Sequence, residues 1–368
     1  MIRSIITNII LLFLCNAAIA QYKIEVLDSN TFTLGDGVAL SKTSFRGLSV
    51  VDDQIIWVSG SKGTIAKSLD AGKTFEFTQI KGYEKSDFRD IEAFDDKRAI
   101  IMSSGTPAYI LKTIDGGQTW KEVYKNLDTA YFLDAMDFWD EKRGILVGDP
   151  IHGHFVLLQT KDAGETWQEL DTNHTPTAME GEAVFAASGT SLRCWGKNEF
   201  GFVTGGTTSN FHSTKNYKKQ SWSNFHIPIL SGKSSQGTFS FTKSKPGMCL
   251  FAGGDYLNDT QTTYADFFYT NSFEENQINS IYIKENFNGY KSSIEILFDN
   301  KKLLAGPIII STGTSGTQIS RRIFREYSIG YVYQHRNFSE PFNVVRKAKM
   351  GNGVFLAGGK GKIGRLLY

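Results

Sequence analysis

Three segments of the chain match one short pattern at nearly constant spacing, and this repeat limits the folds that the chain can adopt. Each segment reads Ser/Thr-x-Asp-x-Gly-x-Thr followed by an aromatic residue, and Asp70, Asp115 and Asp162 lie 45 and then 47 residues apart. Repeats of about 40 to 50 residues are typical of propeller blades. We therefore expect repeated supersecondary units rather than two unrelated domains.

The pattern resembles the Asp-box of sialidase-type repeats, and its chemistry is that of a hairpin turn. An aspartate carboxylate accepts hydrogen bonds from nearby backbone amides, and a glycine tolerates positive φ. The aromatic residue that closes the pattern, such as Trp120 or Trp167, then starts a strand and packs between sheets. We interpret Asp70, Asp115 and Asp162 as structural residues rather than catalytic ones.

Weaker copies of the pattern continue toward the C-terminus. Segment 213–222 keeps the leading serine and the final tryptophan, segment 270–277 keeps little beyond its threonine, and segment 320–327 keeps only its two ends. Turn chemistry can therefore be lost while the repeat is kept.

Two short apolar strands precede each copy of the pattern. The second of them runs into a glycine or small-residue turn, at residues 55–60, 99–102, 144–148, 201–205, 249–253, 303–306 and 354–358. The first lies just upstream, at residues 45–51, 88–94, 132–138, 182–187, 238–241, 293–297 and 343–348. We expect four short strands in each of seven units, and these two segments and the strand that follows the box are three of them.

The predicted fold is therefore all-β, a seven-bladed β-propeller of four-stranded antiparallel blades. The last unit stops at Tyr368 before any box, and the strand 22–27 resembles the fourth strand of an earlier unit. We expect the N-terminal strand to complete the last blade and to remove an exposed sheet edge.

The first twenty residues have the composition of a secretory signal peptide. Arg3 precedes a short apolar run, and small residues lead to an expected cleavage site after Ala20. Cys15 suggests a lipoprotein anchor, but the bulky Leu14 occupies the position before it, where a small residue is expected. We predict an exported protein, periplasmic or extracellular, with residues 1–20 as signal peptide and 21–368 as one propeller domain.

Charge and cysteine content narrow the possible partners. The formal net charge is +2, so no global field recruits nucleic acid or an anionic membrane. Outside the first twenty residues the sequence has no segment of about 18 apolar residues, so we expect no membrane span. Cys194 and Cys249 remain after cleavage, and they either form a disulfide or stay as two buried thiols.

Several segments together resemble one family of repeat proteins. They are residues 45–49, residues 87–91, the Gly148-Asp149-Pro150 turn and the closing residues 354–359. These features are similar to the exported Asp-box propellers of bacteria, which resemble photosynthesis system II assembly factors and are often labelled WD40/YVTN/BNR-like repeat proteins. The resemblance covers residues 22–368. It implies an assembly scaffold that binds a partner polypeptide, and some similar chains carry the label oxidoreductase.

The sequence offers little support for a cofactor or a metal. Residues 359–364 match Gly-x-Gly-x-x-Gly, but too few residues follow to form the helix that a dinucleotide requires. Residues 232–234 lack the earlier glycine of a phosphate loop. His152 and His154 lie in a predicted turn without a third ligand nearby. We expect neither a cofactor nor a metal.

Charged side chains recur on the strands that are expected to line the central channel, and the loops entering these strands form the expected binding face. The candidate residues are Arg46, Arg89, Asp90, Glu92, Asp134, Glu182 and Arg346, with Asp149 and Tyr290 adjacent. One interpretation is a structural ring of salt bridges in the channel. The other is a recognition surface on which arginines bind carboxylates or other anions.

A sialidase-like glycoside hydrolase is the competing hypothesis. Arg46, Arg89 and Arg346 would form its arginine triad and Tyr290 its nucleophile, but Gly47-Leu48 replaces the expected Ile-Pro and Tyr290 has no identifiable partner. An oxidoreductase is a second alternative, without a recognisable cofactor motif. The preferred prediction is a non-catalytic, monomeric scaffold that binds an unidentified envelope or extracellular protein.

Overall fold

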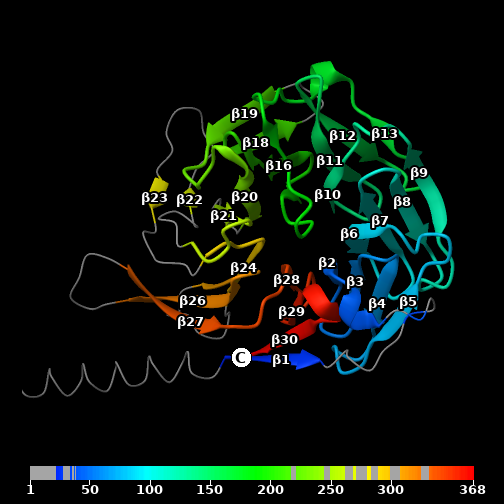
Figure 1. Ribbon diagram of the computed structural model, residues 1–368, viewed down its shortest axis with the longest axis horizontal. Helices are drawn as coiled ribbons and strands as arrows, with labels where there is room; N and C mark the ends of the chain where they lie inside the picture. Colours follow the sequence, from blue (N-terminus) through cyan, green and yellow to red (C-terminus); the bar gives the residue numbers. More distant parts are fainter. Residues whose placement is uncertain are drawn as a thin grey trace, which may run out of the picture.

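The computed structural model describes residues 22–27, 34, 37, 39–216, 221–243, 249–261, 268–270, 280–282, 289–298, 307–324 and 331–368. Seven antiparallel β-sheets stand around a central axis (Figure 1). The described residues also include three short 3-10 helices, η1 (Leu40–Lys42), η2 (Thr172–His174) and η4 (Gly359–Gly361). None of the helices among the described residues is long and apolar enough to cross a membrane.

Blades 1 to 3 are four-stranded sheets whose strands follow chain order from the axis outward. Blade 1 consists of β2 (Phe45–Val50), β3 (Ile56–Gly60), β4 (Thr64–Ser68) and β5 (Glu76–Gln79). Blade 2 consists of β6 (Asp87–Ala93), β7 (Ala99–Ser104), β8 (Ala108–Thr113) and β9 (Lys121–Asn126). Blade 3 consists of β10 (Leu133–Phe138), β11 (Gly144–Ile151), β12 (His154–Thr160) and β13 (Gln168–Glu169).

Blades 4 to 6 follow the same plan with one addition. Blade 4 consists of β15 (Leu192–Trp195), β16 (Glu199–Val203), β18 (Asn210–Asn216) and β19 (Ser221–His226). Blade 5 consists of β20 (Lys233–Lys243), β21 (Cys249–Asp255), β22 (Phe268–Thr270) and β23 (Ser280–Tyr282), and the short strands β17 (Gly205–Gly206) and β14 (Glu182–Ala183) extend its sheet. Blade 6 consists of β24 (Ser293–Leu297), β25 (Ile308–Gly313), β26 (Gly316–Phe324) and β27 (Tyr331–Phe338).

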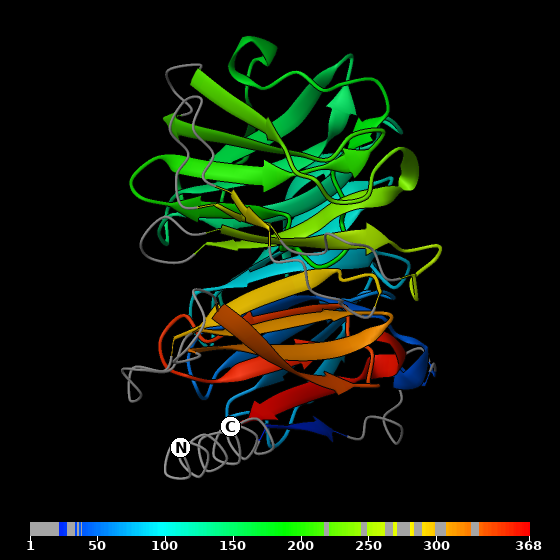
Figure 2. The same cartoon turned by 90° about the vertical axis from the view of Figure 1, so that its left-hand side faces the viewer.

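Blade 7 combines both ends of the described chain. It consists of β28 (Val344–Lys347), β29 (Val354–Ala357), β30 (Ile363–Leu367) and β1 (Lys23–Leu27). The outermost strand β1 runs antiparallel to β30, with Lys23 opposite Leu367 and Leu27 opposite Ile363. This register fits the prediction that the N-terminal strand completes the last blade. Figure 2 shows β1 lying beside the C-terminal strand.

The inner strands form a closed ring. Each inner strand contacts the inner strand of the next blade, in the order β2, β6, β10, β15, β20, β24 and β28, and β28 contacts β2. The seven-bladed propeller predicted from the repeat is therefore confirmed.

Apolar side chains fill the space between neighbouring blades. In β3, Ile56 and Val58 pack with blade 7, whereas Trp57 packs with blade 2, because alternate residues of a strand point to opposite faces. The inner strands of a blade are thus buried on both faces, which explains why their sequences are nearly continuous apolar runs.

The three turns at Asp70, Asp115 and Asp162 share one set of hydrogen bonds. Asp115 accepts hydrogen bonds from the hydroxyl of Thr119 at 2.5 Å, from the backbone amide of the same residue at 3.0 Å, and from the hydroxyl of Thr113 at 2.8 Å. These bonds hold the pKa of Asp115 at about 2. Asp70 and Asp162 make the equivalent contacts. The aromatic residue after the turn packs between blades, as Trp120 does edge-on against Trp57.

One strand prediction and one box prediction differ from the structure. The innermost strand of blade 4 is β15, not residues 182–187, because Glu182–Ala183 pairs with Gly205–Gly206 instead. Ser320, taken as the start of a box, lies inside strand β26. The predicted strand 303–306 and most of the weak copy 270–277 lie outside the described residues. Blade 6 uses Ile308–Gly313 as its second strand.

Candidate binding site in the central channel

A β-bulge recurs at one position of four inner strands. The residue that each bulge leaves without a partner in the neighbouring strand is Arg46, Arg89, Asp134 or Phe239. A bulge re-aims the extra side chain. Three of the candidate residues therefore occupy equivalent positions near the start of the inner strands.

Residues 184–191, which we call the plug segment, lie between β14 and β15 and receive hydrogen bonds from three of the predicted arginines. Arg46 Nη1 donates to Ala187 O at 3.2 Å, Arg89 Nη1 to Ala186 O at 3.3 Å, and Arg346 Nη2 to Gly189 O at 2.9 Å. These arginines come from blades 1, 2 and 7. Each of them donates to a different main-chain carbonyl of the same chain.

Blades 5 and 6 hold the other side of the plug segment. Phe185 stacks on Phe239 with ring centroids 3.9 Å apart, and Ala187 packs in a small cluster with Phe239 and Tyr290. Ser188 Oγ donates to Ser292 O at 2.7 Å. Contacts to inner strands on opposite sides of the ring place the plug segment across the channel, at the end where these strands begin.

The candidate acids Asp90 and Asp134 are buried beneath the plug segment. Asp90 accepts backbone hydrogen bonds from Ile91 and Met136, each at 2.8 Å, and so links blades 2 and 3. Neither oxygen of Asp134 has a hydrogen bond of ordinary geometry among the described residues, although the amides of Ala186 and Asp149 lie near it. Burial raises the pKa of Asp90 and of Asp134 well above the usual aspartate value.

Asp149 fixes the beginning of the plug segment. Its Oδ1 accepts a hydrogen bond from Val184 N at 3.0 Å. Burial raises the pKa of Asp149 to about 6, against the opposing effect of this hydrogen bond.

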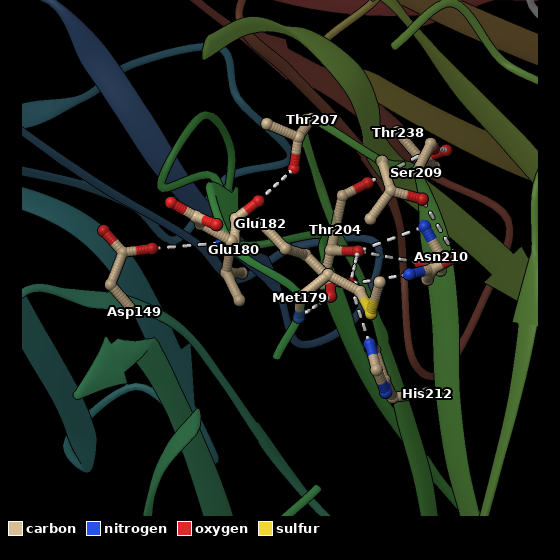
Figure 3. Close-up of polar contacts among 12 residues, drawn as sticks. Asp149, Met179, Glu180, Glu182, Thr204, Thr207, Ser209, Asn210, His212 and Thr238 are labelled. Atoms are coloured by element: carbon tan, nitrogen blue, oxygen red, sulfur yellow. Dashed lines mark hydrogen bonds and ion pairs between the residues drawn. The ribbon is translucent and has the colours of Figure 1, made fainter. Parts of the chain in front are cut away.

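Glu182 lies in a buried polar network rather than on an open face. Figure 3 shows its carboxylate between side chains of blade 4. Its Oε1 accepts hydrogen bonds from Thr204 Oγ1 and from Asn210 Nδ2 at 3.0 Å, and it lies 2.9 Å from His212 Nε2. Met179 N donates to Oε2 at 2.9 Å. Despite burial, the His212 and Thr204 hydrogen bonds lower the pKa of Glu182.

Tyr290 is buried beside the arginines. Burial raises its pKa, and the positive charges of Arg46 and Arg89 oppose this effect. The pKa of Arg46 is lowered by burial and by the neighbouring Arg89. Arg46 and Arg89 thus lie near Tyr290, but both donate hydrogen bonds to the plug segment.

A cavity of about 400 Å³ opens at the other end of the channel, where the inner strands end. It is lined by residues from the inner strands of all seven blades, and we call it the channel pocket. One equivalent position on each inner strand contributes to the lining, namely Ser49, Glu92, Asp137, Arg193, Thr242, Glu295 and Arg346.

Sequence reasoning missed most of this ring. Glu92 and Arg346 were predicted, whereas Asp137, Thr242 and Glu295 were not, although each follows the strand's buried apolar residue directly. Arg193 lies outside the predicted inner strand of blade 4, residues 182–187, because the structure uses Leu192–Trp195 there. Aligning the inner strands on their buried apolar residues would have identified the residue of each strand that lines the channel pocket.

The other sequence motifs have simpler surroundings. Residues 359–364 form η4 and the start of strand β30, with no helix following among the described residues.

Cys194 and Cys249 are free thiols, not a disulfide, and burial raises the pKa of both, that of Cys249 to about 12. The described part of the chain contains no cluster of three His, Cys, Asp or Glu side chains suited to a metal.

The fold and the channel define a class of protein, a seven-bladed propeller with one end of its channel occupied by its own chain. Comparison with known proteins narrows the class. A model of the family described as photosynthesis system II assembly factor YCF48 matches residues 102–184. The chain is a BNR/WD40-like propeller similar to that assembly factor.

Structural neighbours agree on the fold. A structure titled "YCF48 bound to D1 peptide" has a TM-score of 0.58 at 13% identity, covering 95% of this chain and 97% of that chain. The WD40 propeller domain of Doa1 has a TM-score of 0.58 at 10% identity, covering 94% and 97%.

A curated relative matches part of the sequence. The vacuolar protein sorting/targeting protein 10 of Pyricularia oryzae is 28% identical over 156 residues, which is 42% of this chain and 10% of that protein. The match thus spans a small part of that relative's length.

Proposed function

We propose that this protein is an exported, non-catalytic scaffold that binds a partner polypeptide at the mouth of the channel pocket. Export is supported by the signal-peptide pattern of residues 1–20. A scaffold role is supported by similarity to an assembly factor that has a structure with a bound peptide.

The channel pocket is the reason for placing the partner on this face of the propeller. The loops that enter the inner strands, the face favoured by sequence, surround the plug segment, and Arg46 and Arg89 donate hydrogen bonds to it. The opposite face has an open cavity. Next to it, Phe298 and Met350 follow the ends of the adjacent strands β24 and β28 and are 46% and 64% exposed. Aromatic residues, methionine and arginine are enriched in protein interfaces.

The hydrogen bonds of the three arginines favour a scaffold role over sialidase activity. A sialidase needs its arginines to hold a substrate carboxylate. Here each of the three donates to a carbonyl of the plug segment, which makes them positioning residues for that segment.

Affinity capture from the native envelope tests the proposed face. We expect wild type to recover a partner that Phe298→Ser/Met350→Ser loses. The matched control is Met179→Ser/Leu257→Ser, which replaces two side chains, 64% and 77% exposed, on the plug side.

A third variant tests the face predicted from sequence. Arg46→Ala/Arg89→Ala should lower the unfolding temperature, because both side chains hold the plug segment, and should leave recovery of the partner largely unchanged.

Equal recovery of every partner by wild type and by the Phe298/Met350 variant would reject the proposal that the partner binds at the channel pocket.

A further inference from the structure

The acidic residues of the channel pocket already have hydrogen-bond donors. Asp137 accepts backbone hydrogen bonds from Phe138 at 2.9 Å and from Cys194 at 2.6 Å. Glu295 accepts from Thr242 Oγ1 at 3.0 Å and from its neighbour's backbone amide at 3.1 Å. Glu92 pairs with Lys349. Each carboxylate in the lining is therefore stabilised by the protein itself.

Three of the basic residues in the lining donate hydrogen bonds to backbone carbonyls. Arg193 Nε donates to Phe241 O at 3.3 Å, Arg346 Nη2 to Gly189 O at 2.9 Å, and Lys347 Nζ to Ile296 O at 3.2 Å. All three acceptors are neutral carbonyls. The Nη2 group of Arg193 is shielded from solvent and has no hydrogen-bond partner among the described residues. A buried donor without a partner is costly, and a guanidinium group gains most from an anionic acceptor.

The charge balance of the lining is positive. Three acidic residues stand against five basic ones, which are Arg193, Lys243, Arg346, Lys347 and Lys349. Burial raises the pKa of Glu92 and of Asp137, and the nearby charges of Lys349 and Arg193 oppose this effect. Trp195 adds an aromatic wall beneath Lys243, whose Nζ lies 5.1 Å from the ring centroid. The cavity thus offers cationic donors and one apolar surface to a ligand.

We propose that the channel pocket binds the carboxylate group of a ligand through the guanidinium of Arg193 and the ammonium group of Lys347. A planar carboxylate matches the paired donors of a guanidinium group. The ligand is either a free small carboxylate or an acidic group carried by a polypeptide. In the first case the inference goes beyond partner binding, and in the second it rests on the proposed function.

Isothermal titration calorimetry with the full chain tests the inference and separates the two sources. The free acid is succinate, with neutral succinamide as its counterpart. The peptide is acetyl-triglycine with a free C-terminal carboxylate, compared with its C-terminal amide. We expect an acid to bind and its amide not to bind.

Two pocket variants and one control locate the site. Arg193→Gln and Lys347→Gln should each weaken binding of the acid by about tenfold or more, the scale of one charge-assisted hydrogen bond. Lys347 is exposed, so its variant remains informative if Arg193→Gln does not fold. The control Lys81→Gln removes one exposed positive charge outside the pocket and should leave affinity unchanged.

Each outcome has one meaning. Binding of succinate assigns a free carboxylate, and binding of the peptide acid alone assigns a polypeptide source. The inference is overturned if neither acid binds, if the amides bind equally, or if the pocket variants match Lys81→Gln. Partner capture that persists while the acids fail would overturn the carboxylate site and leave the proposed function standing.

Discussion

Gly189 lies where the plug segment packs closely against the inner strand of blade 2. Its φ is +63°, a conformation that residues with a Cβ rarely adopt. A Cβ added there would lie 2.1 Å from Asp90 Oδ1 and 2.2 Å from Asp90 Cγ. The Gly189→Ala substitution therefore strains the backbone and displaces the Asp90 carboxyl.

Both effects have known magnitudes. The left-handed conformation costs roughly 1 to 2 kcal/mol for a residue with a Cβ. Displacing Asp90 breaks its hydrogen bond to Met136 N, and a buried amide without a partner costs about 1 to 3 kcal/mol. We expect Gly189→Ala to lower the free energy of unfolding by roughly 2 to 5 kcal/mol.

Gly82→Ala provides a matched control for urea unfolding at pH 7. Gly82 has a φ of +88°, but no atom lies within 4 Å of the position that a Cβ would occupy, so this variant should lose only the backbone contribution of about 1 to 2 kcal/mol. A loss at Gly189 no larger than the loss at Gly82 would refute the close contact between the plug segment and Asp90.

The closure of the ring, the buried acid Asp149 and the two thiols each give a further testable expectation. Deletion of residues 22–27 should lower the unfolding temperature of the whole ring, because β30 loses its partner strand and the buried Tyr22 is removed; differential scanning calorimetry checks this, and an unchanged transition would contradict it. Because burial raises the pKa of Asp149 to about 6 from 3.8, the native state keeps a proton that the unfolded chain has released, so this group's contribution to stability should fall as pH rises from about 4 to 6. Relative to Asp149→Asn, which keeps an Oδ1 acceptor for Val184, wild type should lose at most roughly 3 kcal/mol across that range, measured by urea unfolding at several pH values, and a difference independent of pH would count against the burial of Asp149. Cys194, which is partly exposed and lines the channel pocket, should react with a thiol reagent before the buried Cys249, whose pKa burial raises to about 12; a native protein in which Cys249 reacts first would contradict the structure.

The blade architecture could be predicted because it follows from local chemistry. Asp70, Asp115 and Asp162 mark tight turns, and glycine or small residues end the second strand of each blade. Apolar runs such as residues 99–102 reflect burial on both faces of an inner sheet. These signals are all contained within a few residues of sequence.

The candidate site could be predicted only in part, because it depends on contacts between distant segments. Arg46 and Arg89 were expected on the inner strands, and their hydrogen-bond partners Ala187 and Ala186 lie 141 and 97 residues away along the chain. A backbone carbonyl has no sequence signature as an acceptor. The pairing of Glu182 with Gly206 likewise depends on the return of a later strand and not on local pattern.

Photo-crosslinking at two matched positions tests most directly which face binds the partner. Met179, on the plug side, and Met350, beside the channel pocket, are each 64% exposed. A photoreactive residue at either position can be activated in the native envelope. We expect a crosslinked partner from position 350 and none from position 179. A partner crosslinked from position 179 alone would contradict partner binding at the channel pocket.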